Sequence, residues 1–394
     1  MFGPLTFEHQ QAIKELRESL GTNKDFAALA EYPDLVSDYR LARFVVARNF
    51  KQEDIIKMVE DNLAWRKTHR ANEVRREVLN KPILAASLPH ADFLRPTFGG
   101  TWNSIAHGGF SRLGDVVHIE AMGLQREGEA MLDFGNKDVL DKLVSHLVGF
   151  FEARNILLDE LSHKEGKLVR TFQIRDASNV SLVHRGSAGP LAKTIMQLGL
   201  LNYPEIASTA IFVNPPAIFM AILALIKPFI PADLDKKLKF VAGNGDHVAK
   251  ELLRYVRPRN VVMWSRIITG KQDGDQVQTE LETREREAKP WESTFDSQVS
   301  ARGTSVLLFA VDKQLPNLSW TSTGKVVPKV YYVALTQERD VGAKEVDVLS
   351  SEVGGDDTAK LPPGVNEALV VLTLDNSSSW VNSKTFQTKV RGYY

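Results

Sequence analysis

The 394-residue sequence contains no cysteine and carries no net charge at pH 7. Without cysteine the chain has no disulfide bonds, no thiol nucleophile and no thiolate metal site. The 49 basic and 49 acidic residues cancel, so no overall field favours nucleic acid, and electrostatic targeting must be local. The amino terminus lacks the basic and apolar regions of a signal peptide. We therefore expect a cytoplasmic protein that does not bind nucleic acid.

The sequence also lacks the short motifs that mark common enzyme sites. It contains no phosphate-binding G-x-x-x-x-G-K-[ST] or G-x-G-x-x-G, no H-E-x-x-H and no G-x-S-x-G. Its nine histidines include no pair at the i, i+4 spacing that would place two metal ligands on one helix face. We predict a protein that is not an enzyme and that needs no metal or cofactor.

One stretch, residues 202–243, contains segments of very different chemistry. Thr209 to Val213 is a β-branched and aromatic run typical of a buried parallel strand. The sequence Asn-Pro-Pro at 214–216 ends that strand, because proline lacks the amide hydrogen that a sheet needs. Every residue from Ala217 to Ile226 is then apolar. A helix at this place has no polar face.

Such a helix is either buried in a core or in contact with lipid. It is too short to cross a bilayer, which takes roughly 20 apolar residues. Two interpretations remain: a fully buried helix, or the wall of an apolar cavity that swings outward. The lysine-rich segment 233–239 follows directly. Apolar surface beside cations is typical of transient contact with an anionic bilayer, although the same lysines also fit an ordinary solvated surface.

These segments carry a family resemblance. The sequence NYPE at 202–205, IFVNP at 211–215, Phe219, KPF at 227–229 and Lys237 together resemble the lipid-gate region of CRAL-TRIO domains. Members of this family carry phosphoinositides, tocopherol, retinoids and other hydrophobic molecules. The resemblance implies an apolar pocket above a floor of strands, closed by the helix 217–226.

The resemblance also implies site residues. The predicted pocket and gate residues are Phe212, Ile218, Phe219, Ile222, Leu223, Ile226 and His118. Glu205 and Lys237 match positions associated with the lipid headgroup in phosphatidylinositol-binding members, and Lys236 and Lys239 would face the membrane. Glu205 also fits a purely structural carboxylate. His118, which lies in a predicted strand, fits a core or pocket histidine better than a metal ligand.

Residues 1–76 predict a helical lobe. In the segment 51–70, Ile55, Val59 and Leu63 recur at helical spacing with Met58 beside them, which gives one apolar stripe. The sequence LARFVVARNF at 41–50 resembles the amino-terminal lobe of CRAL-TRIO proteins. Relatives that hold inositol phosphates commonly have a second arginine where this chain has Val46, so the resemblance favours a neutral lipid or a retinoid as cargo.

Strand-like and helix-like segments alternate over residues 77–270, which predicts an α/β domain with a mostly parallel sheet. The expected strands are 115–121, 167–174, 209–213 and 238–242, and the expected helices are 137–158, 187–201 and 246–255. The sequence RPRNVVMWSRIITG at 257–270 departs from the acidic, glycine-rich ending usual in the family, and no pattern in the sequence accounts for it.

The remaining residues change to the periodicity of strands. Residues 271–290 are polar and predict a linker or an exposed helix. Residues 291–394 predict a β-sandwich with strands at 304–311, 329–335, 368–374 and 385–390. The sequences SARGTS at 300–305, LSW at 318–320 and LDNSSSW at 374–380 resemble a GOLD domain. This domain order is similar to that of the animal supernatant protein factor and tocopherol-associated group, which includes an invertebrate retinal-binding protein.

The favoured function is a non-enzymatic carrier that binds one hydrophobic molecule in a gated pocket and transfers it between membranes or proteins. Burying a lipid chain gains about 0.8 kcal/mol per CH₂ group, so an apolar pocket alone is able to hold it. Tocopherol, a retinoid, squalene and a phospholipid are the candidate cargoes, and membrane contact is expected to be peripheral and transient. The alternative is a lipid-regulated adaptor in trafficking or signalling that binds a protein partner through the GOLD domain.

Overall fold

The structure is a computed structural model. It describes residues 4–81, 85–98, 109–122, 136–178, 180, 194–195, 198–227, 230, 232–243, 245–270, 291–314, 316–333, 348–352, 358–361, 363–379 and 382–393. Contacts divide the chain into two compact units. The first unit comprises Met1–His107 with Gly114–Phe240, and the second comprises Gly108–Leu113 with Val241–Tyr394. The predicted linker 271–290 lies outside the described residues.

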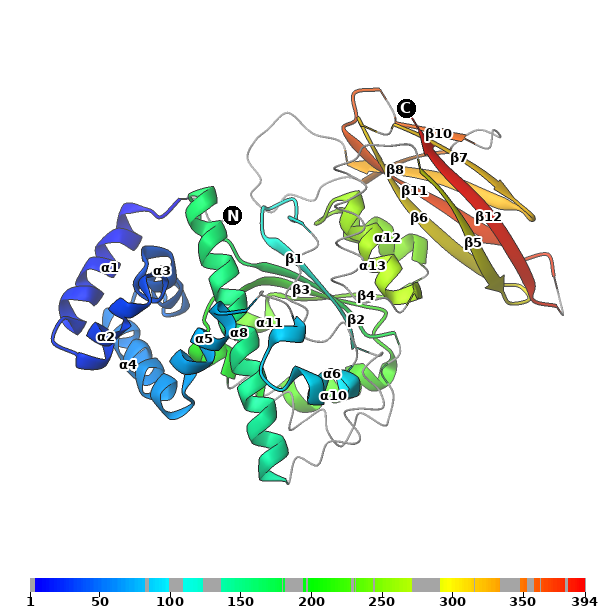
Figure 1. Ribbon diagram of the computed structural model, residues 1–394. Helices are drawn as coiled ribbons and strands as arrows, with labels where there is room; N and C mark the ends of the chain where they lie inside the picture. The colour runs from blue at the N-terminus through cyan, green and yellow to red at the C-terminus, as the bar shows by residue number, and fades with distance from the viewer. Residues whose placement is uncertain are drawn as a thin grey trace. The chain divides into compact units, whose positions relative to one another are not determined.

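The first unit begins with the predicted helical lobe (Figure 1). Its helices are α1 (Phe7–Leu20), α2 (Lys24–Ala28), α3 (Asp38–Ala47), α4 (Gln52–Thr68) and α5 (Ala71–Leu79), with short 3₁₀ turns at Leu29–Glu31 and Pro33–Val36. Side-chain oxygens of Thr6, Asn23 and Ser37 accept backbone amides at the starts of α1, α2 and α3, which satisfies donors that a helix leaves open.

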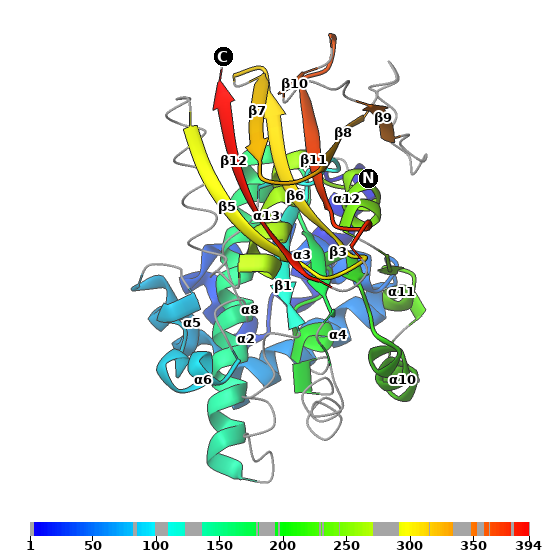
Figure 2. The same cartoon turned by 90° about the vertical axis from the view of Figure 1, so that its right-hand side faces the viewer.

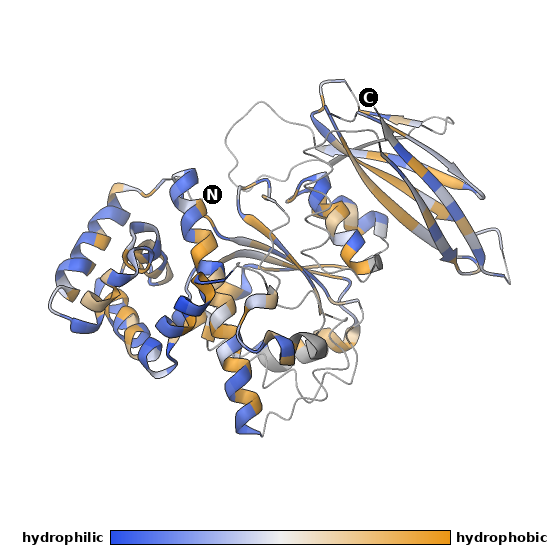
Figure 3. Ribbon diagram, in the orientation of Figure 1, coloured by the Kyte–Doolittle hydropathy of each residue, from blue (hydrophilic) through white to orange (hydrophobic). Residues whose placement is uncertain are grey.

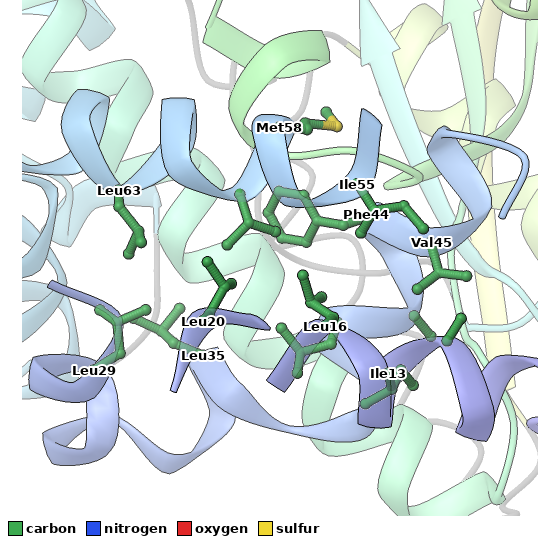
Figure 4. Close-up of a cluster of buried hydrophobic side chains, with 14 of the residues drawn as sticks. Ile13, Leu16, Leu20, Leu29, Leu35, Phe44, Val45, Ile55, Met58 and Leu63 are labelled. Atoms are coloured by element: carbon green, nitrogen blue, oxygen red, sulfur yellow. The ribbon is translucent and has the colours of Figure 1, made fainter. Parts of the chain in front are cut away.

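Apolar side chains from three helices form the core of this lobe. Figure 4 shows Ile13, Leu16 and Leu20 of α1 facing residues of α3 and α4. The stripe predicted on α4 is buried: Ile55, Met58, Val59 and Leu63 are all members of this core. The charged side of α4 is not uniformly exposed, however, because Arg66 is only 2% exposed. The lobe therefore buries more than its apolar stripes.

The lobe is joined to a long helix, α8 (Lys137–Glu165), by buried ions. Glu152 of α8 accepts from Arg66 Nη1 at 2.7 Å and from Arg75 Nη1 at 2.9 Å, and the Tyr203 hydroxyl donates to the same carboxylate at 2.7 Å. The side chains of Glu152, Arg66 and Arg75 are between 0% and 2% exposed. The carboxylate of Glu152 thus connects α4, α5 and residue 203.

A second set of buried groups lies nearby on α8. Arg43 of α3 lies 3.6 Å from the carboxylate of Asp159 and donates to the carbonyl of Val169 at 2.8 Å. Arg40 donates to the side chain of Asn155 and to the carbonyl of Asn202 at 3.3 Å. These hydrogen bonds satisfy donors that burial would otherwise leave costly.

The α/β part of the first unit contains a four-stranded sheet in the order β1-β2-β3-β4. The strands are β1 (Val116–Ala121), β2 (Thr171–Asp176), β3 (Ala207–Val213) and β4 (Leu238–Val241). The pairs β1–β2 and β2–β3 are parallel, as predicted. The helices α6 (Ala91–Phe98), α10 (Ala217–Ile226) and α11 (Ala232–Asp235) also belong to this part, and most of the predicted helix 187–201 lies outside the described residues. Figure 2 shows the sheet with α8 and α10 from a second side.

The second unit consists of two helices, α12 (Gly245–Leu253) and α13 (Pro258–Gly270), with eight described strands. One antiparallel sheet has the order β10-β7-β12-β5 and the other β6-β11-β8-β9. The strands are β5 (Trp291–Val299), β6 (Thr304–Asp312), β7 (Asn317–Ser322), β8 (Val326–Val333), β9 (Val348–Glu352), β10 (Thr358–Lys360), β11 (Glu367–Asp375) and β12 (Lys384–Tyr393). Hydrophobic residues run along β6 and β11 (Figure 3). The predicted fold class, a helical lobe with an α/β domain and then a β-sandwich, is confirmed.

The unexplained sequence at 257–270 contains α13, which begins at Pro258. Its residues Val261, Trp264 and Ile267 are buried, and the helix packs against β6 and β11. Helix α12 also contacts the strands, and Asp246 at its start accepts from Lys329 Nζ at 3.0 Å. The apolar residues of this ending therefore belong to the core of the second unit.

Candidate ligand site and gate

Helix α10 is the predicted gate, and the structure gives its two sides different environments. It begins after Pro216, where the preceding Asn214 has a left-handed backbone with φ of 51°. This conformation is tolerated by asparagine better than by most residues, and it redirects the chain from β3 into the helix. Among the described side chains of this helix, the exposed ones belong to Ala217, Met220, Ala221 and Ala224.

The opposite side of α10 packs on strand β3. Phe219 is 8% exposed, and its ring lies 5.2 Å from that of Phe212 on β3. Phe212 also stacks on Phe240 of β4 at 5.5 Å. Ile218 and Leu223 are half-buried, and Leu223 packs on the same cluster as Phe212 and Phe219. The side chains of the predicted gate residues Ile222 and Ile226 lie outside the described part of the chain.

The sheet face beneath α10 has a polar strip as well as this apolar patch. Strand register pairs Glu120 with Arg175 and Arg175 with Phe212, and register partners on parallel strands point to the same face. His118 lies two residues before Glu120, so its side chain shares this face. Arg154 of α8 reaches the strip and donates to His118 Nδ1 at 3.0 Å.

His118 is therefore a buried, hydrogen-bonded histidine, and its role in lining a ligand pocket stays a prediction. It is 3% exposed. Burial, followed by the positive charges of Arg154 and Arg175, lowers the pKa of His118 well below its usual value, so the imidazole is neutral at pH 7. Among the described residues, no group of three or more histidine, aspartate or glutamate side chains is placed to hold a metal ion.

Glu205 and Lys237, which sequence reasoning linked to a headgroup, meet in the structure. Lys237 Nζ donates to Glu205 Oε1 at 2.9 Å, and Arg170 Nη1 donates to Oε2 at 2.8 Å. Arg43 donates to the Glu205 carbonyl at 2.9 Å, and Glu205 has a left-handed backbone with φ of 54°. Both carboxylate oxygens of Glu205 accept from cations, which fits a structural role for this carboxylate. Lys237 is half-buried.

The remaining predicted membrane residues lie on the surface. Lys236 and Lys239 are exposed, as is Lys227 at the end of α10. Phe240, next to Lys239, is 40% exposed, and Met220 is 41% exposed. Apolar and cationic side chains thus share the exposed surface of residues 217–240. No described helix combines the length and the apolar character that crossing a membrane requires.

Sequence reasoning missed Arg154, Arg170 and Arg175. Arg175 directly follows the last residue of the predicted strand 167–174, where a charged side chain fits an ordinary strand end. Arg154 and Arg170 carried no signal either, since a charged residue in a helix or at a strand start is normally assigned to solvent. Their roles depend on partners that are distant in the chain.

Comparisons with known proteins find similarity to one domain family and to several curated proteins. The CRAL/TRIO domain family matches residues 110–262. Patellin-6 from Arabidopsis thaliana is 26% identical over 258 residues, covering 64% of this chain and 57% of that protein. SEC14 cytosolic factor from Eremothecium gossypii is 25% identical over 262 residues, covering 66% of this chain and 76% of that protein.

One further curated relative and one solved structure are also similar. Protein real-time from Aedes aegypti is 25% identical over 211 residues, which cover 53% of this chain and 30% of that protein. The chain therefore spans less than two thirds of the length of Patellin-6 and about a third of that of Protein real-time. Among solved structures, the crystal structure of Sfh5 is similar with 19% identity and a TM-score of 0.45, covering 61% of this chain and 82% of that chain.

Proposed function

We propose that the chain carries one hydrophobic molecule at a time without changing it chemically. The match of residues 110–262 to the CRAL/TRIO domain family supports this proposal. The observation that supports this function is the two-sided use of α10. One side packs Phe219 on the sheet, while the other exposes Met220 and Ala224 although every residue of the helix is apolar. A helix that served only as core would bury both sides.

The proposed mechanism is a gate that opens at a membrane. The exposed apolar side of α10 enters the lipid interface, and Lys227, Lys236 and Lys239 orient this surface toward anionic headgroups. The contacts of Phe219 with Phe212 then exchange for contacts with lipid, so that opening costs less at the membrane than in water. A cargo molecule enters between α10 and the sheet, and the helix closes over it.

Uptake of a labelled lipid from vesicles tests this proposal. We expect Phe219→Asp and Leu223→Asp to abolish uptake while the circular dichroism spectrum stays that of the folded protein, because a carboxylate under α10 opposes an apolar cargo. Leu79→Asp is the matched control, since Leu79 is a 48% exposed hydrophobic residue in the helical lobe. Normal uptake by both gate variants would refute the gate.

Two features of the chain bear on which class of hydrophobic molecule it carries. Val46 favours a neutral lipid, tocopherol or a retinoid over a phosphoinositide. The pairing of Glu205 with both Arg170 and Lys237 supports the same preference, because these groups already satisfy one another. Native mass spectrometry of protein purified from a eukaryotic host, combined with lipid extraction, identifies the cargo by its mass.

We also propose a cytosolic location with transient membrane contact, which the name of the Eremothecium gossypii relative, SEC14 cytosolic factor, supports. The assignment of the carboxy-terminal strands to a GOLD domain stays a prediction, as does the boundary at residues 271–290. Two four-stranded antiparallel sheets fit that assignment. Purified protein that is empty of lipid yet captures a specific protein partner would favour the adaptor function instead.

A further inference from the structure

The sheet face under α10 is amphiphilic in a definite order. Towards β1 and β2 it presents His118, Glu120 and Arg175, and towards β3 it presents Phe212. The Arg175 guanidinium lies 6.0 Å from the centre of the Phe212 ring, so the polar strip and the apolar patch adjoin. Adjacent strands are about 4.8 Å apart, so the step from polar to apolar takes only one or two strand spacings.

The polar strip mainly offers hydrogen-bond donors. Arginine only donates, so the bond between Arg154 and His118 makes Nδ1 the acceptor and leaves the ring hydrogen of the neutral imidazole on Nε2. Arg175 donates through Nε to Gln173 at 3.0 Å, and its Nη1 lies 3.5 Å from Glu120. Each guanidinium carries five N–H groups in a fixed fork, so one arginine is able to serve several acceptors at once.

The strip is also held in place by packing. The Arg154 guanidinium lies 4.8 Å from the centre of the Phe150 ring on the same helix, and Arg154 is 2% exposed. Burial lowers the pKa of Arg154 to about 9, so the group stays cationic at pH 7. A buried guanidinium that packing holds in place is the protein group that best matches a carboxylate, which accepts two parallel hydrogen bonds.

We propose that Arg154, Arg175 and His118 bind the polar end of the cargo, and that the preferred cargo is a long-chain amphiphile ending in a carboxylate. This inference rests on the proposed carrier function and refines its cargo class. The carboxylate lies against the donors on β1, β2 and α8, and the hydrocarbon chain follows the face toward Phe212 and Phe219 under α10. A neutral ester of the same chain keeps the apolar contacts and loses the ionic ones.

A pair of matched probes tests the proposal on the full chain. cis-Parinaric acid is a fluorescent 18-carbon carboxylate, and its methyl ester has the same chain without the charge. We expect the acid to bind at least about tenfold more tightly than the ester, the usual size of a hydrogen bond to a charged partner. We expect Arg154→Met and Arg175→Gln each to reduce this acid-to-ester preference severalfold or more, and to leave ester binding nearly unchanged.

Control variants distinguish the carboxylate site from the carrier function itself. Arg76→Gln removes a cation that is 58% exposed in the helical lobe and should keep the full preference. Arg175, with a side chain 28% exposed, is the safer variant if Arg154→Met does not fold. Equal binding of acid and ester would overturn the carboxylate site and leave the carrier function intact. A preference that survives both variants would overturn the assignment to these arginines, and failure to bind either probe would refute the carrier function itself.

Discussion

Helices α8 and α10 lie in the same unit of the chain but are held by opposite kinds of contact. Helix α8 is fixed to the helical lobe through Glu152, whose carboxylate accepts from two arginines and a tyrosine in a site excluded from water. Helix α10 is fixed to the sheet by Phe219, which lies on Phe212, while its other side is exposed. One contact is ionic and directional, and the other is apolar and tolerant of sliding.

The difference separates a fixed part of the carrier from a part that is able to move. A buried ion pair loses most of its energy when its partners shift, because the desolvated charges are then uncompensated. An apolar contact has no required geometry, and lipid can replace it at little cost. We therefore expect perturbations at α8 to lower global stability and perturbations at α10 to change local opening and membrane contact.

The largest effect is expected for Glu152→Gln. This change leaves Arg66 and Arg75 buried without their shared carboxylate and should lower the free energy of unfolding by about 3–5 kcal/mol. Urea or thermal unfolding followed by circular dichroism measures it. The matched control is Asp61→Asn, which breaks the exposed ion pair with Lys57 and should change stability by less than about 1 kcal/mol. If Glu152→Gln lowers the free energy of unfolding as little as Asp61→Asn does, the buried ions do not fix α8 to the helical lobe.

The contribution of Glu152 should also depend on pH. Burial by itself raises the pKa of this carboxyl, but Arg66 and Arg75 outweigh burial and lower the pKa from 4.5 to about 2. Because the pKa of Glu152 is lower in the folded protein than in the unfolded chain, its ionised carboxylate stabilises the folded state fully above about pH 4.5. This stabilisation, about 3 kcal/mol, is lost as pH falls from about 4.5 to about 2. The stability difference between the parent protein and Glu152→Gln should shrink over that range, and a constant difference would contradict the ionic role of Glu152.

The sequence pointed to the apolar helix α10 but not to the ionic contacts of α8. The apolar run 217–226 was recognised because ten consecutive apolar residues have few explanations. The contacts of Glu152 were not, because helical periodicity assigns charged residues such as Arg66 to the solvent side. Whether a charge is buried depends on its partners, and Arg66 and Glu152 are 86 residues apart in the chain.

The same limit explains the other differences between expectation and structure. The α/β order and the parallel sheet follow from local patterns and were predicted. Helix α13 was not, because the apolar residues of 257–270 are explained only by strands β6 and β11, which come later in the chain. Strands β5, β7, β9 and β10 were also missed. Strand β5 has few apolar residues among its polar ones, and the other three strands are only three to six residues long.

A smaller effect is expected where α10 meets the sheet. Phe219→Ala removes an aromatic pair worth about 0.5–1.5 kcal/mol beyond its buried area. Hydrogen exchange should show the amides of α10 opening at a lower free energy than those of α8 in the parent protein. In Phe219→Ala, exchange in α10 should accelerate by about tenfold while exchange in α8 stays unchanged. Equal acceleration in both helices would mean that α10 does not open on its own.

The smallest effect on stability, and the one that isolates the membrane role, is expected for Met220→Ser. Met220 is 41% exposed, so its loss should change the free energy of unfolding by less than about 0.5 kcal/mol. Binding to vesicles that contain phosphatidylserine should nevertheless weaken severalfold, because the interface gains from each apolar side chain that enters it. Leu79→Ser, at a hydrophobic residue of α5 that is 48% exposed, controls for the general loss of exposed apolar surface. If both variants bind vesicles like the parent protein, the exposed side of α10 does not touch the membrane, and opening must be driven by the cargo alone.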